Sequence, residues 1–462
     1  MTFVNLLLIL FCMISRSIKT CLRKIFGDRF SDETGLLFAY SYDAKFEGAP
    51  DAVVFPVDSD EVSRLLSLAT EEGFPVIPRG AGTGQTGGSI PVEGGVVLSL
   101  ERMNRILELD RENLTLTVEP GAITGDVKSY VAGFGLYYPP DPASYEFSTI
   151  GGNIAENAGG IHAVKYGVTA NYVLGLEVVL PTGEMISFSG KLYKNATGYD
   201  LRDIFIGSEG TLGVITRAVL KLVPAPEAYA TALVGFPDVS SIRRLASTVR
   251  SLSASACELV GKNIVPILME NFPSTLPPKT SYLMLVEFDG FGDEPKRLLD
   301  SMLSSFREVS FVVARDDSER ERLWDIRRNV SPVIRANCTR GVSEDIVVPP
   351  ASVPEMLEFL EELQAEFSVK IFSFGHAGDG NLHVNICYDE LFPERQIEQL
   401  LEALFRKTVS LGGALSGEHG VGIAKKRFLD IYLSEESIRL HRRLKRILDP
   451  RGILNPGKIF DE

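Results

Sequence analysis

The stretch Pro78-Arg79-Gly80-Ala81-Gly82-Thr83-Gly84-Gln85-Thr86-Gly87-Gly88 decides how the first half of this chain folds. It follows the β-branched pair Val76-Ile77, which we expect to form a strand. Gly82, Gly84 and Gly87 match the G-x-G-x-x-G pattern of dinucleotide-binding loops. A Rossmann site of that kind requires a helix that begins inside the motif, because the pyrophosphate lies at the helix N-terminus.

The residues after this loop argue against such a helix. Ser89-Ile90-Pro91-Val92-Glu93-Gly94-Gly95 contains one proline and two glycines, which disfavour a helix. We therefore expect a non-helical nest, in which successive backbone N–H groups converge on an anion in conformations that glycine adopts easily. Arg79 is expected at the mouth of the nest, where it adds positive charge. A glycine turn without a ligand is the alternative.

A second run of small residues and amides supports the nest. Residues 151–160 read Gly-Gly-Asn-Ile-Ala-Glu-Asn-Ala-Gly-Gly, a composition suited to a flat aromatic group that lies close to the backbone. Between the two runs, β-branched segments at 96–100 and 114–118 predict strands joined by tight turns. Two further strands are expected at 174–180 and 212–222.

A helix is predicted just before the first glycine loop. Asp58 is expected to cap it, Glu61 to complete a capping box and Gly73 to end it. Its apolar residues recur at helical spacing at Val62, Leu65, Leu66 and Ala69.

The composition changes at Pro224-Ala225-Pro226, where we place a domain boundary. Beyond it glycine becomes rarer, and strands alternate with longer amphipathic helices, which predicts an α+β domain with helices over a sheet. The expected strands cover 231–236 and 282–288, and the expected helices cover 238–252, 295–306, 318–336 and 353–366. From residue 412 glycine returns, which indicates a separate C-terminal segment.

Charge and cysteine content exclude several classes of protein. The net charge of -14 disfavours binding to nucleic acid, which draws on clustered Lys and Arg. The cysteines form no C-x-x-C pair, which argues against iron–sulfur clusters, a structural Cys-zinc site and a disulfide framework. A reducing, cytoplasmic setting is the expectation that follows. The five cysteines are Cys12, Cys21, Cys257, Cys338 and Cys387.

Residues 1–25 form an N-terminal extension of unusual composition. Phe3 to Ile14 is almost wholly apolar, but a bilayer-spanning helix needs about 20 such residues. A secretory signal would carry positive charge before the apolar run, whereas Arg16 and Lys19 follow it. Four interpretations stay open: an upstream start codon with Met13 as the true start, a segment packed on the protein, a peripheral membrane foot, and a cleaved signal.

Four motifs occur in a fixed order along the chain. They are Pro78-Arg79-Gly80-x-Gly82-Thr83, Pro139-Pro140-Asp141-Pro142, Thr149-Ile150-Gly151-Gly152-Asn153-x-x-x-Asn157-x-Gly159-Gly160 and Gly207-Ser208-Glu209-Gly210-Thr211-Leu212-Gly213. Together they resemble the FAD-linked oxidases of the vanillyl-alcohol-oxidase superfamily. The resemblance covers roughly residues 30–460 and is strongest to the D-lactate, glycolate and D-2-hydroxyglutarate dehydrogenases.

The resemblance implies an α+β fold in three parts. These are a two-subdomain FAD-binding fold of the p-cresol-methylhydroxylase type in 26–225, a ferredoxin-like substrate domain in 226–411, and a C-terminal segment, 412–462, that returns to the flavin. Some relatives attach flavin through a His in the first loop, but residues 79–95 contain none, so non-covalent FAD is expected. The implied FAD contacts are Arg79, Gly80, Ala81, Gly82, Thr83, Gly84, Gln85, Pro140, Asp141, Thr149, Gly152, Asn153, Asn157, Gly160, Glu209, Ile215 and Asn455.

Three of the five histidines lie in two short motifs. The segment 371–385 reads as a strand, a tight turn and a strand, which brings His376 and His383 to one end of a hairpin. The other motif is Gly417-Glu418-His419-Gly420. Two His and one Glu form a three-ligand set that leaves a position open for substrate, as in catalytic zinc sites. Histidines that only form hydrogen bonds in a core are the alternative.

The resemblance assigns roles to these residues. It implies a divalent metal, zinc or else manganese or iron, bound by His376, His383 and Glu418, with His419 as the base. A metal chelated by a 2-hydroxy acid lowers the pKa of the substrate hydroxyl, and an imidazole can then take its proton. The flavin accepts the hydride from the α-carbon.

A cationic partner is expected for the substrate carboxylate. The resemblance points to Arg327, on a predicted helix, through a bidentate fork, and a solvated helix arginine is the alternative. Asn385 shares a strand face with His383 and is expected to contact substrate. Relatives that bind dicarboxylates carry a further basic residue near 344–349, but this stretch begins with two acidic residues here. A monocarboxylate such as D-lactate or glycolate is therefore preferred.

The leading hypothesis is an FAD-linked 2-hydroxy-acid dehydrogenase. A transferase like the alkylglycerone-phosphate synthases, a D-2-hydroxyglutarate dehydrogenase and a non-catalytic flavin scaffold are the alternatives. The expected electron acceptor is a quinone, a cytochrome, an electron-transfer flavoprotein or an iron–sulfur partner subunit. A homodimer and a peripheral membrane contact of an otherwise cytoplasmic protein stay open.

Overall fold

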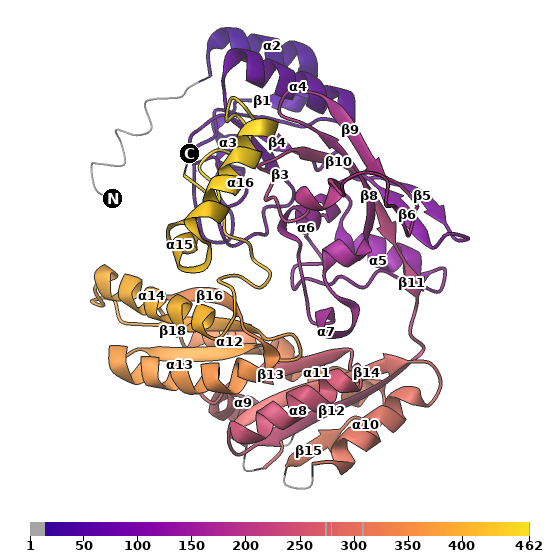
Figure 1. Ribbon diagram of the computed structural model, residues 1–462, viewed down its shortest axis with the longest axis vertical. Coiled ribbons are helices and arrows are strands. Elements are labelled where there is room, and N and C mark those ends of the chain that lie inside the picture. Colours follow the sequence, from indigo (N-terminus) through magenta and orange to yellow (C-terminus); the bar gives the residue numbers. More distant parts are fainter. Residues whose placement is uncertain (1–13, 273–274, 279, 307–308, 462) are drawn as a thin grey trace. The chain divides into compact units, whose positions relative to one another are not determined.

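The computed structural model describes residues 14–272, 275–278, 280–306 and 309–461, which fall into two compact units (Figure 1). Unit 1 holds the chain up to Ala158, Val168–Ala225 and the residues from Glu418 onward. Unit 2 holds Gly159–Gly167 and Pro226–Gly417. The chain thus passes between units at Ala225, next to the predicted boundary, and returns at Glu418 rather than at 412. The excursion at Gly159–Gly167 has no counterpart in the sequence-based division.

Unit 1 contains two main sheets. The first has the order β1-β2-β4-β3, and β2 and β3 run parallel to β4. The second has the order β5-β6-β10-β8-β9 and is antiparallel, while β7 and β11 form a separate pair. The strands are β1 Phe30–Ser31, β2 Ala52–Val54, β3 Val76–Arg79, β4 Val96–Ser99, β5 Ile106–Asp110, β6 Thr115–Val118, β7 Leu136–Tyr137, β8 Val173–Val179, β9 Met185–Ser189, β10 Val214–Lys221 and β11 Val223–Pro224.

Helices complete unit 1 around these sheets. The α-helices are α2 Arg16–Phe26, α3 Thr34–Ala39, α4 Ser59–Glu72, α5 Thr124–Ala132, α6 Ile150–Glu156, α15 Leu429–Tyr432 and α16 Glu435–Leu448. The 3-10 helices are η1 Gly27–Arg29, η2 Thr169–Tyr172, η3 Arg202–Ile204 and η5 Lys426–Phe428.

Helix α4 begins and ends where the sequence predicts. The Asp58 side chain accepts a hydrogen bond from the backbone N–H of Glu61, and Gly73 ends the helix in the left-handed conformation. The predicted capping box is wrong, however. The Glu61 carboxylate accepts from the N–H of Val57 and pairs with Arg29, because a buried carboxylate is stabilised more by a guanidinium than by a second backbone contact.

The N-terminal region from Ile14 onward is an integral part of unit 1. Ile14, Ile18, Leu22 and Phe26 recur every four residues and lie buried in the core beside α4 and the first sheet. Residues 14–26 therefore pack on the rest of unit 1. The apolar run before Ile14 lies outside the described residues. No helix of the described chain is long and apolar enough to span a membrane.

The C-terminal segment pairs with strand β3 at the edge of the first sheet of unit 1. Leu454 bridges Val76 of β3 in parallel, and Asn455 donates its backbone N–H to the carbonyl of Val76. The buried Asp449 at the end of α16 accepts from the N–H groups of Ile453 and Leu454. These bonds fix the last residues of the chain against the strand that leads into the glycine loop.

Unit 2 is built on one antiparallel seven-stranded sheet of order β15-β12-β14-β13-β17-β18-β16. Within it β12-α8-β13 and β14-α10-β15 give the spatial order fourth, first, third, second, which is the predicted ferredoxin-like arrangement. The strands are β12 Ala228–Phe236, β13 Ala256–Val260, β14 Tyr282–Gly290, β15 Ser310–Val313, β16 Gly341–Val347, β17 Lys370–His376 and β18 Asn381–Cys387. The helices are α7 Ala163–Tyr166, α8 Ser240–Ser251, α9 Val265–Asn271, α10 Glu294–Ser304, α11 Asp317–Arg328, α12 Val330–Ala336, η4 Pro350–Ser352, α13 Val353–Phe367 and α14 Glu394–Ser410.

The helix predicted over 318–336 is two helices, α11 and α12, that meet at Asn329. Pro332 explains the break. It has no N–H to donate to the carbonyl of Arg328, and its ring crowds the preceding turn. The side-chain amide of Asn329 donates to the carbonyl of Asp325 at 2.8 Å, which supplies a partner at the end of α11.

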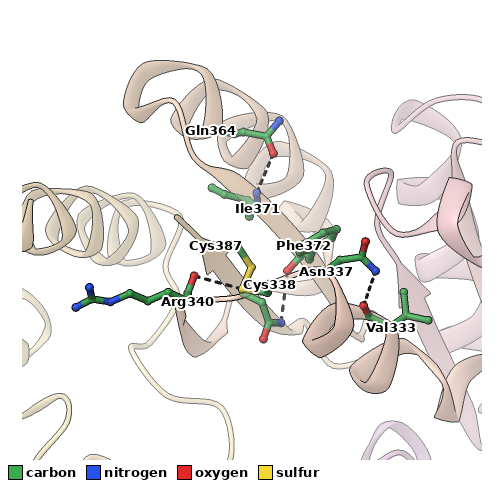
Figure 2. The surroundings of a disulfide bond; sticks show 9 residues. Val333, Asn337, Cys338, Arg340, Gln364, Ile371, Phe372 and Cys387 are labelled. Atoms are coloured by element: carbon green, nitrogen blue, oxygen red, sulfur yellow. Dashed lines mark hydrogen bonds between the residues drawn. A yellow bond between two sulfur atoms is a disulfide. The ribbon is translucent and has the colours of Figure 1, made fainter. Parts of the chain in front are cut away.

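Two of the scattered cysteines are paired. Cys338 lies just before β16 and Cys387 ends β18, and they form a disulfide with Cα atoms 5.4 Å apart (Figure 2). The pairing of β16 with β18 sets Gly341 opposite Cys387 and so brings the two sulfurs together. The sequence, which argued against a disulfide framework, did not predict this single disulfide, because 49 residues separate the partners and only the strand pairing brings them together. Cys21 and Cys257 are free, and Cys12 lies outside the described residues.

We predict that Cys387→Ser lowers the free energy of unfolding of unit 2 by about 2–4 kcal/mol, because the cross-link restricts the unfolded chain. Urea denaturation measures this change, and peptide mapping without reductant should recover the Cys338–Cys387 peptide pair. Cys21→Ser, at an exposed free thiol, is the control and should leave stability unchanged. Alkylation of both Cys338 and Cys387 in the native protein without reductant would contradict the pairing.

Candidate functional site

The glycine loop of unit 1 is non-helical, as its sequence predicts. It leaves β3 at Arg79, and residues 80–95 contain no helix. Gly82 and Gly87 adopt φ of 70° and 82°, in the left-handed region that glycine enters at little cost. The Rossmann alternative is therefore excluded for this loop.

The loop packs against the second run of small residues. A side chain at Gly80 would clash with the hydroxyl of Thr149, and a Cβ at Gly88 would lie 3.0 Å from the Glu156 carboxyl. Glycine at these two positions therefore permits close approach of the two segments. Within unit 1 the glycine loop therefore meets the α6 segment along small residues and backbone, which we call the glycine surface.

Arg79 does not stand at the mouth of the loop as expected. Its side chain is buried, and its guanidinium donates to the carbonyl of Tyr42 at 2.8 Å. A Cβ at Gly82 would clash with the same guanidinium. Arg79 thus braces the loop from inside. Asp43, which the sequence analysis missed, accepts from the N–H of Gly87 at 2.9 Å and holds the other end of the loop.

Glu209 and Asn455 join the loop to the C-terminal segment. Glu209 adopts a left-handed φ of 51°, and its carboxylate accepts from the N–H groups of Val421 and Gly422, both at 2.7 Å. The Asn455 amide donates to the carbonyls of Gly88 at 2.7 Å and Glu209 at 2.8 Å. Both residues were predicted to contact the cofactor, and both bring separate segments of unit 1 together here.

The Gly417-Glu418-His419-Gly420 motif enters unit 1 at Glu418. The hydroxyl of Thr86, in the glycine loop, donates to the backbone carbonyl of His419 at 3.1 Å. A side chain at Gly420 would clash with the Glu156 carboxyl. His419, the predicted base, is therefore tethered to the glycine loop through its backbone.

The remaining predicted cofactor residues have varied surroundings. Thr149 caps α6 by accepting from the N–H of Gly152, and the Asn153 amide donates to Thr124 at 2.7 Å. Asn157 ends α6 in the left-handed conformation. Gly160 belongs to unit 2, and Ile215 is buried in β10. Six predicted contacts in the loop itself are exposed or half-buried: Gly80, Ala81, Gly82, Thr83, Gly84 and Gln85.

The Pro140-Asp141 turn has an organising cation that the sequence analysis missed. The Lys128 ammonium donates to the carbonyls of Tyr138, Pro139 and Pro140, at 2.8, 3.2 and 3.1 Å. Burial lowers the pKa of Lys128 to about 8. A single lysine on α5 therefore sets the shape of the proline-rich turn.

Several buried polar atoms of this region fit a bound cofactor. Within the described chain, the Tyr138 hydroxyl, Glu156 Oε2 and Asn455 Oδ1 are buried without a hydrogen-bond partner. Buried polar atoms without partners are rare in proteins and call for an explanation. A ligand with polar groups, lying against the glycine surface, would supply the missing partners.

Glu156 and Glu209 form a buried carboxyl pair. Burial raises the pKa of Glu156 well above its ordinary range, and Glu209 and Asp43 add to the effect. Burial also raises the pKa of Glu209, although the backbone N–H groups of Val421 and Gly422 oppose the shift. Two carboxylates held close together away from water repel each other when both are ionised, which favours the protonated form of Glu156.

One face of the sheet in unit 2 carries the predicted metal ligands. In the β17–β18 hairpin His383 lies directly opposite Phe374, and in the β16–β18 pair it lies opposite Asp345. His376 lies two residues after Phe374 and opposite Glu258 of β13. Because side chains alternate along a strand, all five project from the same face.

The two imidazoles of this face are neighbours. The ring centroids of His376 and His383 are 5.5 Å apart with the planes at 86°, and Phe374 stands 4.9 Å from His383. Both histidines are buried. The hairpin thus brings the two residues together as the sequence predicted.

Arg327 has a different partner from the one expected. Its Nε and Nη2 both contact Oε2 of Glu258 at 2.7 Å, and its guanidinium lies 4.9 Å from the Phe374 ring centroid. The Nε and Nη2 groups of Arg327, which were expected to bind a substrate carboxylate, therefore bind the Glu258 carboxylate instead. Sequence alone could not show this, because Glu258 lies on strand β13, 69 residues before Arg327 of helix α11.

Asp345 anchors the segment that precedes Glu418. This buried carboxylate accepts from Asn381 Nδ2 at 2.6 Å, from the Ser416 hydroxyl at 2.8 Å and from the Gly417 N–H at 3.0 Å. These contacts hold the backbone at Gly417, the residue directly before Glu418. Asn385, a predicted substrate contact, shares the face of His383, and its amide lies 3.5 Å from the Phe372 carbonyl.

We predict that Glu156→Gln makes unit 1 more stable than the parental protein at about pH 8 and equally stable near pH 4. The raised pKa of Glu156 means that the folded state binds the proton more tightly than the unfolded chain. This contribution is complete below the ordinary pKa of about 4.3 and is lost as pH rises toward the raised value. Glutamine does not ionise, so the variant loses no stability from this group as pH rises. Melting temperatures across this pH range measure the difference.

Glu61→Gln is the matched control, with the opposite sign. The hydrogen bond from Arg29 lowers the pKa of Glu61, so its contribution is present above the ordinary pKa and is lost as pH falls. This variant should melt below the parental protein at about pH 8, with the gap narrowing in acid. An E156Q protein that melts below the parental one at alkaline pH would show that Glu156 is ionised.

Two family models match the chain. Residues 50–189 match the FAD binding domain, and residues 225–459 match the C-terminal domain of FAD linked oxidases. The glycolate oxidase subunit GlcD of Bacillus subtilis is 39% identical over 458 residues, covering 97% of each protein. A D-lactate dehydrogenase of Anaerostipes hadrus is 34% identical over 429 residues, covering 89% of each.

A solved structure of p-cresol methylhydroxylase with substrate bound superimposes with a TM-score of 0.78 at 16% identity, covering 96% of each chain. This likeness confirms the predicted fold. The family models and the relatives confirm the predicted resemblance. The chain belongs to the FAD-linked oxidases, with an FAD-binding domain followed by the C-terminal domain that characterises this family.

Proposed function

We propose that this protein is a dehydrogenase that oxidises a small 2-hydroxy acid, D-lactate or glycolate, to the 2-oxo acid with non-covalent FAD. The observation that carries the proposal is the pair His376 and His383 on one sheet face, with Arg327 hydrogen-bonded to the same Glu258 as His376. Relatives named as a glycolate oxidase subunit and a D-lactate dehydrogenase support this substrate class.

FAD would be held by the surface of small residues in unit 1. Gly82 and Gly87 take left-handed backbone conformations that give the loop its non-helical shape, and Glu156 and Asn455 offer buried polar groups. FAD, when bound, accepts a hydride from the α-carbon of the substrate. Residues 79–95 contain no histidine, which supports a non-covalent link.

His376, His383 and Glu418 would bind a divalent metal. The imidazoles stand next to each other, and Asp345 fixes the chain one residue before Glu418. Two imidazoles and a carboxylate suit zinc, manganese or iron and leave coordination positions for a hydroxy acid. When bound, such a metal lowers the pKa of a coordinated hydroxyl.

His419 would take the hydroxyl proton, and Arg327 would orient the carboxylate. Thr86 holds the His419 backbone, so the imidazole is positioned by the same loop that forms the FAD surface. Arg327 uses Nε and Nη2 for Glu258, so its Nη1 side is the edge directed to substrate. The buried pairing fixes the orientation of that edge before substrate binds.

The acidic residues of β16 support a monocarboxylate. Asp345 is committed to Asn381 and the 416–417 turn, and its neighbour Glu344 is also acidic. Neither supplies a cation for a second carboxylate. A D-2-hydroxyglutarate dehydrogenase is therefore the less favoured alternative, and a transferase is the alternative from another reaction class.

We predict that the purified protein is yellow and that anaerobic D-lactate or glycolate bleaches its flavin absorbance. Denaturation should release the FAD into the supernatant, since no covalent link is expected. D-2-Hydroxyglutarate should bleach more slowly at equal concentration, because residues 344–349 contain no basic side chain for its second carboxylate. Flavin that no 2-hydroxy acid reduces would favour the transferase, and faster reduction by D-2-hydroxyglutarate would reverse the substrate preference.

We also predict that His419→Ala slows flavin reduction by about 10²- to 10⁴-fold while FAD and metal stay bound, because only the proton acceptor is lost. Loss of a residue that hydrogen-bonds to a metal ligand lowers metal affinity by about 10- to 100-fold, and His383→Ala removes a proposed ligand itself, so it should lower the affinity further. Stopped-flow absorbance and metal analysis separate the two effects. His441→Ala, on the exposed face of α16, is the control. Either site variant with parental flavin reduction would disprove its assigned role.

A further inference from the structure

We infer that Glu258 is a positioning residue that holds the metal-binding imidazole of His376 and the guanidinium of Arg327 with one carboxylate. The inference rests on the proposed function and adds a residue that neither sequence motif contains. Glu258 lies on β13, far from the histidine motifs in sequence, and its side chain is fully buried.

Strand pairing places Glu258 at the site. Glu258 and His376 are directly opposed partners of β13 and β17, so their side chains project side by side from the same face. Arg327 reaches this face from α11. The register of two central strands therefore fixes the relation between the carboxylate and the imidazole, and no loop movement is needed to form it.

The two carboxylate oxygens have separate partners. Oε1 lies 2.6 Å from Nδ1 of His376, and Oε2 lies 2.7 Å from both Nε and Nη2 of Arg327. A carboxylate paired with a guanidinium accepts hydrogen bonds, which favours the imidazole tautomer with the proton on Nδ1 of His376. The imidazole lone pair is then on Nε2, which is the nitrogen that can bind a metal.

The same carboxylate sets the direction of Arg327. Binding through Nε and Nη2, together with Phe374 at 4.9 Å from the guanidinium carbon, fixes the plane of the group. Its remaining edge, Nη1, has one orientation for a substrate carboxylate. Glu258 therefore couples the position of the metal ligand to that of the substrate clamp.

Glu287 shows what a purely structural carboxylate looks like in the same sheet. It is fully buried on β14 and binds Arg320 through both oxygens, at 2.7 and 2.8 Å. The Trp324 indole at 2.8 Å and the Thr231 hydroxyl at 2.6 Å also donate to it. None of these partners is a proposed site residue, so Glu287 matches Glu258 in burial and charge without contacting the site.

The test compares Glu258→Gln with Glu287→Gln in the FAD-loaded protein. In glutamine one of the two acceptor oxygens becomes an NH₂ donor, so either Nδ1 or the guanidinium loses its acceptor, and E258Q should lower the affinity for Zn²⁺ or Mn²⁺ by about 10- to 100-fold. It should also raise KM for the hydroxy acid while FAD remains bound. E287Q should lower the melting temperature but keep parental metal affinity and KM. Calorimetric titration of chelator-treated protein with each metal alone gives the affinities.

The outcomes separate this inference from the proposed function. If the parental protein binds neither metal, or His376→Ala binds as the parental protein does, the proposed metal site is wrong. If the parental protein binds metal and H376A does not, but E258Q keeps parental affinity and KM, the role of Glu258 is overturned. Should E258Q fail to fold, Glu258→Asp carries the same test, because the shorter carboxylate keeps its charge but withdraws from Nδ1. Parental metal affinity and KM in that variant would equally overturn the role.

Discussion

Burial of carboxylates among a limited set of donors is the constraint on which both units depend. In unit 2, Glu258 is removed from water and can remain ionised only because His376 and Arg327 surround it. Glu258, which is not itself a proposed substrate contact, therefore holds both Arg327 and His376 in place. The partnership also explains why Arg327 is not available as an open fork, and why the edge it offers is already fixed in direction.

Unit 1 solves the same problem in another way. Glu209 accepts two backbone N–H groups from the C-terminal segment, whereas Glu156, beside it, has one buried oxygen without a partner. The first carboxylate binds backbone N–H groups of the C-terminal segment, and burial together with its neighbour raises the pKa of the second. The loop, the α6 segment and the C-terminal residues thus form one surface because buried polar groups need partners from distant parts of the chain.

Local patterns of sequence were sufficient for the elements that depend on neighbours in the chain. The Asp58 cap, the Gly73 end of α4 and the β17–β18 hairpin follow from residues within a few positions of one another. The expectations that failed involve partners far away. Glu61 binds Arg29 instead of closing a capping box, and the side chain of Arg79 turns inward beneath its own loop. The cysteines 338 and 387 pair although no spacing rule suggests it.

The sequence by itself determined the cofactor and the family, because the glycine loop and the three later motifs occur in a fixed order. They are also rich in glycine, whose backbone conformations other residues rarely adopt. It also determined that His376 and His383 lie together, since one tight turn joins their strands. Only the tertiary structure decided what holds His376 and what Arg327 faces. Glu258 is 118 residues from His376 and 69 from Arg327, and it meets them because antiparallel pairing of β13 with β17 sets the register. Such pairing is a property of the whole sheet, chosen by the burial of every strand in it, and no local pattern specifies it.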